Sequence, residues 1–187
     1  LGDRAFSRGQ FETARVEYKE YVDRKPGEAR VQLMYARTLL ALKQPAMAVE
    51  HASVAFDQLP DDEQAIETKA QALFESGRTD EMYKFLRGLA DGRGQVGDFS
   101  RLGQYTAKLG DADGADHALK TAAKLDAGKT LAPQMALANF YTSIGDTAAA
   151  KRRLRMALYI DPANPEVAKR LRDMGEIPGP SLALPPE

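Results

Sequence analysis

Apolar residues recur three and four positions apart along most of the chain, which is the spacing of amphipathic helices. In segment 29–62, Leu33 and Leu39 fall on one such stripe, and Ala48, Ala52 and Ala55 fall on a second. Neither helix of such a pair could bury its apolar face alone. Similar pairs continue to about residue 162, and no strand is visible. The pattern therefore predicts an all-α chain of paired helices.

Turn and cap residues stand where these helices should begin and end. Gly77 follows an apolar helical run and is expected to end it, since glycine accepts positive φ. Pro45 suits the first turn of a helix, where its missing N–H costs nothing. Asp111 and Asp146 are expected to cap helix N-termini. The breaks agree with the apolar pattern in predicting short helix hairpins.

The hairpins repeat with a period of about 34 residues. Pro26 and Pro60 are 34 positions apart, and so are Ala14 and Ala48. A fixed period in this range is typical of a solenoid, in which one supersecondary unit stacks on copies of itself. The predicted units are 1–28 (partial), 29–62, 63–95, 96–130 and 131–164, followed by a capping helix at 165–174 and a Pro-rich extended tail at 175–187.

The residues at these positions resemble the tetratricopeptide repeat over residues 1 to about 162. The aromatic residue that often opens the motif is absent, and Ala127 stands where a closing proline is expected in the fourth unit. The resemblance implies a right-handed superhelical α-solenoid of stacked helix-turn-helix repeats with a C-terminal capping helix. The matching residues are Leu102-Gly103, Gly110, Ala115, Leu119 and Ala122 in the fourth unit, and Tyr141, Gly145, Ala150, Leu154, Ala157 and Pro162 in the fifth.

Composition narrows the functional classes. Of 187 residues, 43% are hydrophobic, enough for a continuous core, while a net charge of −1 argues against a nucleic-acid binder. The absence of cysteine excludes disulfides and thiol catalysis. No apolar run is long enough for membrane insertion. The chain starts in mid-pattern at Leu1, which indicates a trimmed or processed N-terminus and leaves the compartment open.

Two short motifs have simpler interpretations than the ligand sites they suggest. Residues 92–97 read G-x-G-x-x-G, but a dinucleotide site needs a preceding strand, so we interpret them as an inter-repeat loop that can serve as a joint. Residues 111–116 resemble a calcium loop, but Ala122 stands where the bidentate Glu is required. Neither His51 nor His117 has a second ligand at metal spacing. We expect no cofactor and no metal.

Catalysis is not expected, because no nucleophile, base and orienting group can be assembled from the sequence. The most basic run contains Lys151, Arg152, Arg153 and Arg155. Such a run is usually a solvated helix face. The alternative is a docking surface for an acidic partner or for phosphate groups.

The family resemblance implies a concave binding groove lined by the first helix of each repeat. The paired Lys and Asn that clamp a chaperone C-terminus are absent, since Leu33 and Arg37 stand at equivalent positions. Amides and guanidinium groups are suited to bind a peptide backbone, and apolar residues to anchor it. Alignment of the repeats assigns Arg30, Leu33, Arg37, Leu40, Glu67, Gln71, Phe74, Arg101, Gln104, Lys108, Met135, Asn139 and Thr142 to the groove.

These observations predict a non-catalytic scaffold that binds a peptide or helix of a partner protein in this groove. Analogy with the family suggests assembly of bacterial pili, secretion systems, the envelope or polysaccharide machinery. One alternative is a homo-oligomer, in which the tail of each copy lies in a neighbour's groove. A second is a regulatory repeat domain of a larger enzyme.

Overall fold

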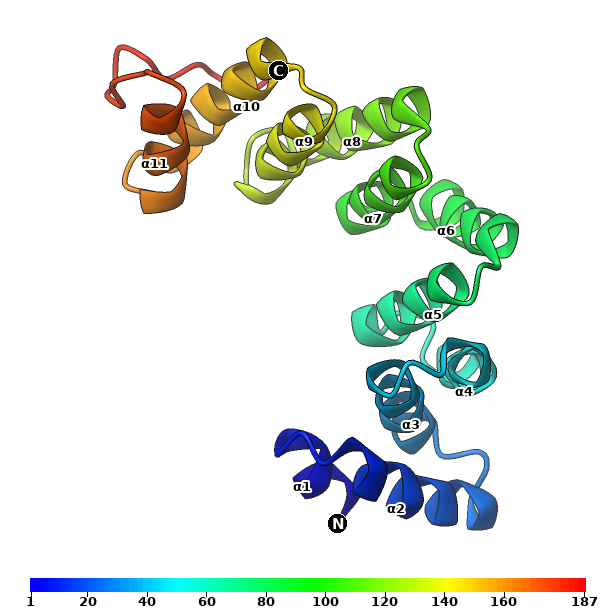
Figure 1. The fold of residues 1–187 in the computed structure, drawn as a ribbon. Coiled ribbons are helices and arrows are strands. Elements are labelled where there is room, and N and C mark those ends of the chain that lie inside the picture. The colour runs from blue at the N-terminus through cyan, green and yellow to red at the C-terminus, as the bar shows by residue number, and fades with distance from the viewer. The chain divides into compact units, whose positions relative to one another are not determined.

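The computed structural model describes residues 1–187, and it contains helices and connecting segments but no strand. The predicted all-α fold is confirmed. Short connections join the helices (Figure 1). Their bounds are α1 Gly2–Ser7, α2 Phe11–Arg24, α3 Ala29–Ala41, α4 Pro45–Gln58, α5 Glu63–Glu75, α6 Thr79–Arg93, α7 Val96–Lys108, α8 Ala112–Asp126, α9 Ala132–Ser143, α10 Thr147–Ile160 and α11 Pro165–Asp173.

The chain divides into two compact units, Leu1–Phe85 and Leu86–Glu187. In the first, α1 packs on α2 and α3 on α4, and each of these pairs also contacts the helix that follows it. In the second, α7 packs on α8 and α9 on α10, and α11 covers α10. Each unit is thus built from helix hairpins stacked in chain order, as the repeat pattern predicts.

Small residues allow the two helices of a hairpin to approach closely. Ala36, Ala70, Gly103 and Ala138 hold equivalent positions in successive repeats, and all four are buried. At Gly103 a Cβ atom would lie only 2.6 Å from Cγ of Leu119 on α8. The contact between α7 and α8 therefore has room for glycine but not for a larger residue.

Each first helix ends in a turn whose backbone is left-handed. Gly77, Gly110 and Gly145 have φ of 77°, 82° and 79°, as the sequence predicts for helix-ending glycines. Lys43 holds the equivalent position after α3, with φ of 58°. This conformation is unfavourable for a residue with a Cβ atom, so the turn after α3 carries local strain that the equivalent turns with glycine avoid.

Asp111 and Asp146 cap their helices as predicted. The Asp111 carboxylate accepts a hydrogen bond from the N–H of Gly114, and Asp146 accepts one from Ala149, both over 2.9 Å. Pro45 is the first residue of α4. The sequence therefore defines where these helices begin by ordinary capping chemistry.

The C-terminal part of the second unit caps the last hairpin. Val167 and Leu171 of α11 are fully buried against Leu154 and Leu158 of α10. The tail, residues 175–187, contains no helix and returns over α10. The apolar edge of the last repeat is thus covered by both α11 and part of the tail.

Candidate binding pocket

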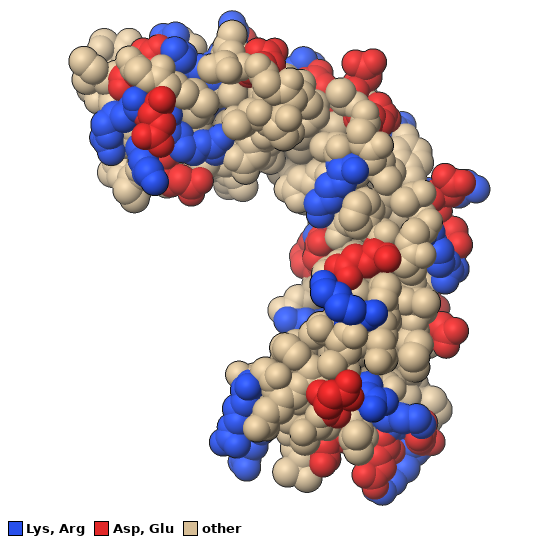
Figure 2. Space-filling view, in the orientation of Figure 1, with Lys and Arg blue, Asp and Glu red and all other residues tan.

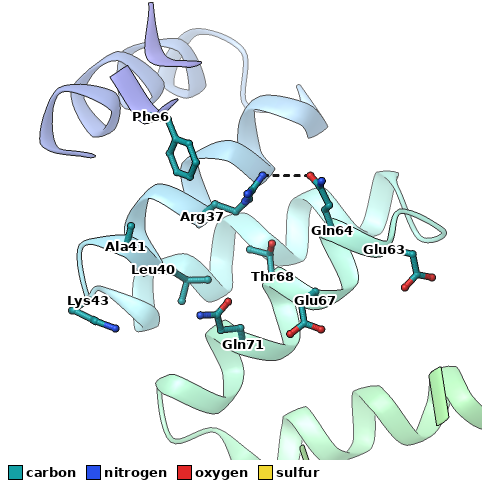
Figure 3. Close-up of a pocket in the computed structure, with 10 residues that line it drawn as sticks. All are labelled: Phe6, Arg37, Leu40, Ala41, Lys43, Glu63, Gln64, Glu67, Thr68 and Gln71. Atoms are coloured by element: carbon teal, nitrogen blue, oxygen red, sulfur yellow. Dashed lines mark hydrogen bonds between the residues drawn. The ribbon is translucent and has the colours of Figure 1, made fainter. Parts of the chain in front are cut away.

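A pocket of about 490 Å³ lies in the first unit between α1, α3 and α5 (Figure 3). The first helices of consecutive repeats supply most of its lining, which is the arrangement that the family resemblance implies. Phe6 comes from α1, and Lys43 from the turn after α3. The lining residues are Phe6, Arg37, Leu40, Ala41, Lys43, Glu63, Gln64, Glu67, Thr68 and Gln71.

The repeat register explains why these side chains meet. Arg37 and Gln71 both stand six residues before the left-handed turn residue of their repeat, Lys43 and Gly77 respectively. Helices α3 and α5 pack against each other and present equivalent faces to the pocket. A side chain from each repeat therefore reaches the same hollow.

Arg37 is held in place from several sides. Its guanidinium carbon lies 5.3 Å from the centre of the Phe6 ring, in a cation–π contact. Its Nη1 donates to Oε1 of Gln64 over 3.4 Å and to the sulfur of Met34 over 3.6 Å. These contacts leave further guanidinium donors for a ligand. Arg37 is therefore the best positioned cation in the pocket.

The rest of the lining combines opposite charges with amides and one aliphatic anchor. Lys43 adds a second cation, while Glu63 and Glu67 on α5 supply carboxylates. The amide of Gln71 donates to Glu75 over 2.7 Å, which orients its oxygen away from that bond. This chemistry suits a peptide segment, whose backbone and charged side chains need both donors and acceptors.

The second unit has its own pocket of about 380 Å³ between α7, α8 and α9. Gln104 and Asn139 stand six residues before Gly110 and Gly145, so they are the repeat equivalents of Arg37 and Gln71. The lining residues are Gln104, Ala107, Lys108, Leu119, Ala136, Asn139, Phe140 and Ser143. The same repeat position therefore faces a pocket in each unit.

The structure places two of the assigned groove residues elsewhere. Leu33 is only 1% exposed and packs with Ala55 and Ala65 in the core. The side chain of Arg101 is 11% exposed, and its Nη1 lies 3.7 Å from the buried Asp98. Neither residue lines the pocket between α1, α3 and α5 or the one between α7, α8 and α9.

A register shift explains the placement of Arg101. Gly77 and Gly110 are 33 residues apart, so the residue equivalent to Glu67 is Ser100 and not Arg101. The equivalent of Arg101 is Thr68, which is buried. Counting from the left-handed glycine selects Ser100 in place of Arg101.

The other assigned residues have varied surroundings. Arg30 is exposed and lies 3.5 Å from the Asp62 carboxylate, and Phe74 is half-buried. Asn139 and Thr142 accept hydrogen bonds from Arg170 of α11, over 2.6 and 3.3 Å. Met135 packs against the apolar cluster of α10 and α11. The capping helix thus engages part of the surface assigned to a ligand.

The sequence interpretation missed Phe6, although a signal for it exists. Phe6 stands three residues before Gly9, whose φ is 71°, just as Leu40 precedes Lys43 and Phe74 precedes Gly77 by three. The partial first repeat therefore contributes a pocket residue at a regular position. Lys43 and Gln64 were missed because both depend on how α3 and α5 pack together.

The glycine-rich stretch 92–97 includes the end of α6 at Arg93, the connecting residues Gly94 and Gln95, and the start of α7 at Val96. Nε of Arg93 donates to Oδ2 of Asp98 over 3.0 Å, and its Nη2 donates to Gln95 over 2.9 Å. Asp98 is 1% exposed. A buried ion pair between Arg93 and Asp98 therefore links the end of α6 to the start of α7.

Comparison with known proteins identifies the repeat. Residues 5–71 match the family model described as tetratricopeptide repeat, and the helix hairpins continue beyond that segment. Residues 5–71 carry the tetratricopeptide repeat. The resemblance inferred from the sequence is confirmed. No curated protein matches the sequence.

Solved tetratricopeptide structures share the fold. TTC0263, a thermophilic tetratricopeptide protein of Thermus thermophilus, is 20% identical over 92% of this chain and 94% of its own, with a TM-score of 0.63. MamA of Desulfovibrio magneticus RS-1 is 16% identical over 88% and 93%, with a TM-score of 0.64. PilW, a type IV pilus biogenesis factor, is 17% identical over 91% of this chain and 79% of its own, with a TM-score of 0.66.

No helix of this chain has the length and apolarity to cross a membrane.

Proposed function

We propose that these repeats form a non-catalytic scaffold that binds a peptide or short helix of a partner protein. The observation that carries this proposal is the pocket between α1, α3 and α5, where Arg37 is held by Phe6 and Gln64. A positioned cation loses little conformational freedom on binding, which favours affinity. The lining offers groups for recognition and no nucleophile–base pair for a reaction.

The lining chemistry defines the ligand that we expect. An apolar side chain would rest against Leu40 and the Phe6 ring. An acidic residue beside it would reach Arg37 and Lys43, and a basic residue would reach the carboxylates of α5. The favoured ligand is therefore a segment in which an apolar anchor is flanked by charges of both signs.

The biological setting is proposed by analogy. PilW, which shares the fold, is described as a pilus biogenesis factor. We infer that this chain serves a comparable assembly, in a bacterial pilus, secretion system, envelope or polysaccharide machinery. The support for this step is similarity of fold alone.

The test is selection of peptides from a displayed random library on the intact chain, followed by titration of the selected peptides. Arg37→Glu should weaken their binding at least about tenfold, because it removes a charge-assisted contact and places a third carboxylate in the pocket. Arg15→Glu is the matched control, since Arg15 is a half-buried arginine on α2 outside the pocket. Equal binding to the wild type and to folded Arg37→Glu would overturn the proposal.

A further inference from the structure

The end of the tail, residues 182–187, lies along α10 after a turn in which the N–H of Leu182 donates to the carbonyl of Gly179 over 3.0 Å. Nε of Arg155 donates to the carbonyl of Leu182 over 2.7 Å, and the N–H of Leu184 donates to the carbonyl of Arg155 over 3.0 Å. One residue of α10 thus binds the tail through both its side chain and its backbone. This is the way in which proteins often hold a peptide ligand.

Side chains of the tail contact separate parts of the second unit. Leu182 and Ala183 pack on the apolar cluster that contains Leu154 and Leu158. Pro186 lies over Gly128, where an added Cβ atom would come within 2.7 Å of its ring. The contact therefore depends on the absence of a side chain at Gly128.

Charge complementarity completes the arrangement. Glu187 forms ion pairs with Arg152 and Arg153, and Glu176 pairs with Lys151 over 2.8 Å. The basic run of α10 is therefore covered in part by acidic residues of the same chain. Figure 2 shows Lys and Arg side chains gathered near α11, with acidic side chains among them.

The tail does not fill the surface on which it lies. A hollow of about 410 Å³ remains between Leu184 and the Lys151, Arg152 and Arg155 side chains of α10. A second, of about 330 Å³, lies between Tyr159 and Pro180. Arg152 and Glu187 are each more than half exposed, so their ion pair is easily exchanged for another. The surface has room for a larger ligand than the tail.

We propose that this side of α10 is a docking surface for an extended, acidic partner segment, and that residues 182–187 act as its internal competitor. The expected ligand has three apolar residues followed by prolines and a carboxylate, as the tail itself does. A partner segment of this chemistry displaces the tail. The surface is separate from the α3–α5 pocket, so each proposal can fail without the other.

The first experiment measures hydrogen exchange of the Leu184 amide in the full chain. We expect exchange about tenfold slower than in an unstructured segment, because this N–H donates to α10. Arg152→Glu should abolish most of that protection, because it sets a carboxylate against that of Glu187. Arg172→Glu is the matched control, on an exposed arginine of α11. An unprotected Leu184 amide in the wild type, or full protection in Arg152→Glu, would overturn the internal contact.

The second experiment measures competition with a labelled peptide that has the sequence of residues 176–187. Leu184→Pro in the full chain removes the tail's N–H donor and leaves α10 unchanged. The peptide should bind this variant about tenfold more tightly than the wild type, whose site is mostly occupied. A peptide carrying Glu187→Lys should bind both proteins more weakly, because it loses the ion pair with Arg152. Equal affinity for both proteins, or for both peptides, would refute a displaceable tail.

Light scattering of the same samples distinguishes a second copy as the occupant. A monomeric wild type agrees with an internal competitor. A dimer that dissociates in Leu184→Pro would assign the tail to a neighbour's α10 and overturn the intramolecular proposal.

Discussion

At the scale of single residues, Lys43 shows where this repeat sequence departs from its own pattern. Glycine fills the left-handed turn at the equivalent positions 77, 110 and 145, whereas Lys43 adopts it at φ of 58°. We expect Lys43→Gly to raise the free energy of unfolding by about 1 kcal/mol, measured by urea denaturation, because the Cβ strain is relieved. Lys43→Ala retains the Cβ atom and should bring no comparable gain. Equal stabilisation by both substitutions would contradict the strain.

His51 shows how a buried polar network determines a tautomer. Nε2 of the buried Gln32 donates to the carbonyl of Pro26 over 2.5 Å, so its Oε1 is left as the acceptor. Nδ1 of His51 lies 2.6 Å from that oxygen and must carry the proton. The Tyr35 ring packs 4.5 Å away, centre to centre. Burial lowers the pKa of His51, which favours the neutral ring.

This lowered pKa predicts a pH dependence of stability. Below the ordinary histidine pKa the unfolded chain binds more protons than the folded one, so the free energy of unfolding should fall as pH decreases from about 7.5 towards 5.5. Urea titrations at several pH values measure the slope. His51→Gln should flatten it. A slope unaffected by His51→Gln would contradict the prediction.

At the scale of helices, a buried glutamine links the two helices of a hairpin in the second repeat and again in the fifth. Gln32 on α3 meets His51 on α4, and Gln134 on α9 accepts a hydrogen bond from Arg153 on α10 over 3.4 Å. Each pair spans 19 residues, and both glutamines are almost fully buried. The pairing explains why Arg153 is only 7% exposed, although its basic neighbours suggested a solvated face.

Helix packing at Gly103 gives a prediction with a close control. Gly103→Ala should lower the free energy of unfolding by about 1–3 kcal/mol, since the new Cβ atom would overlap Leu119 and its backbone N–H. Gly88→Ala lies in the interior of α6 with open space around it, so it should stabilise by about 0.5–1 kcal/mol. Urea denaturation measures both. A change of the same sign in the free energy of unfolding for both substitutions would contradict this account of the α7–α8 contact.

At the scale of the whole molecule, the sequence predicted the fold better than the residues of the candidate pocket. Helix bounds depend on local features such as Asp111, Gly77 and Pro45, each of which can be recognised in isolation. The pocket residues, in contrast, depend on the repeat register. One repeat is shortened, and this shift is why the alignment selected Arg101, whose side chain lies beside the buried Asp98. The tail's contact with Arg155 has no periodic signal, because it follows from a single return of the chain.

Contacts between neighbouring helices dominate each unit, so damage to one hairpin should remain local. Gly103→Val forces α7 away from α8, and we expect amide exchange to rise at least about tenfold in α7 and α8, with much smaller changes in α3 and α4. Ala36→Val, at the equivalent buried position of α3, should raise amide exchange mainly in α3 and α4, with much smaller changes in α7 and α8. Hydrogen-exchange mass spectrometry of both variants provides the reciprocal comparison. Exchange that rises equally in both units for either variant would show global cooperativity, which nearest-neighbour stacking of these repeats does not predict.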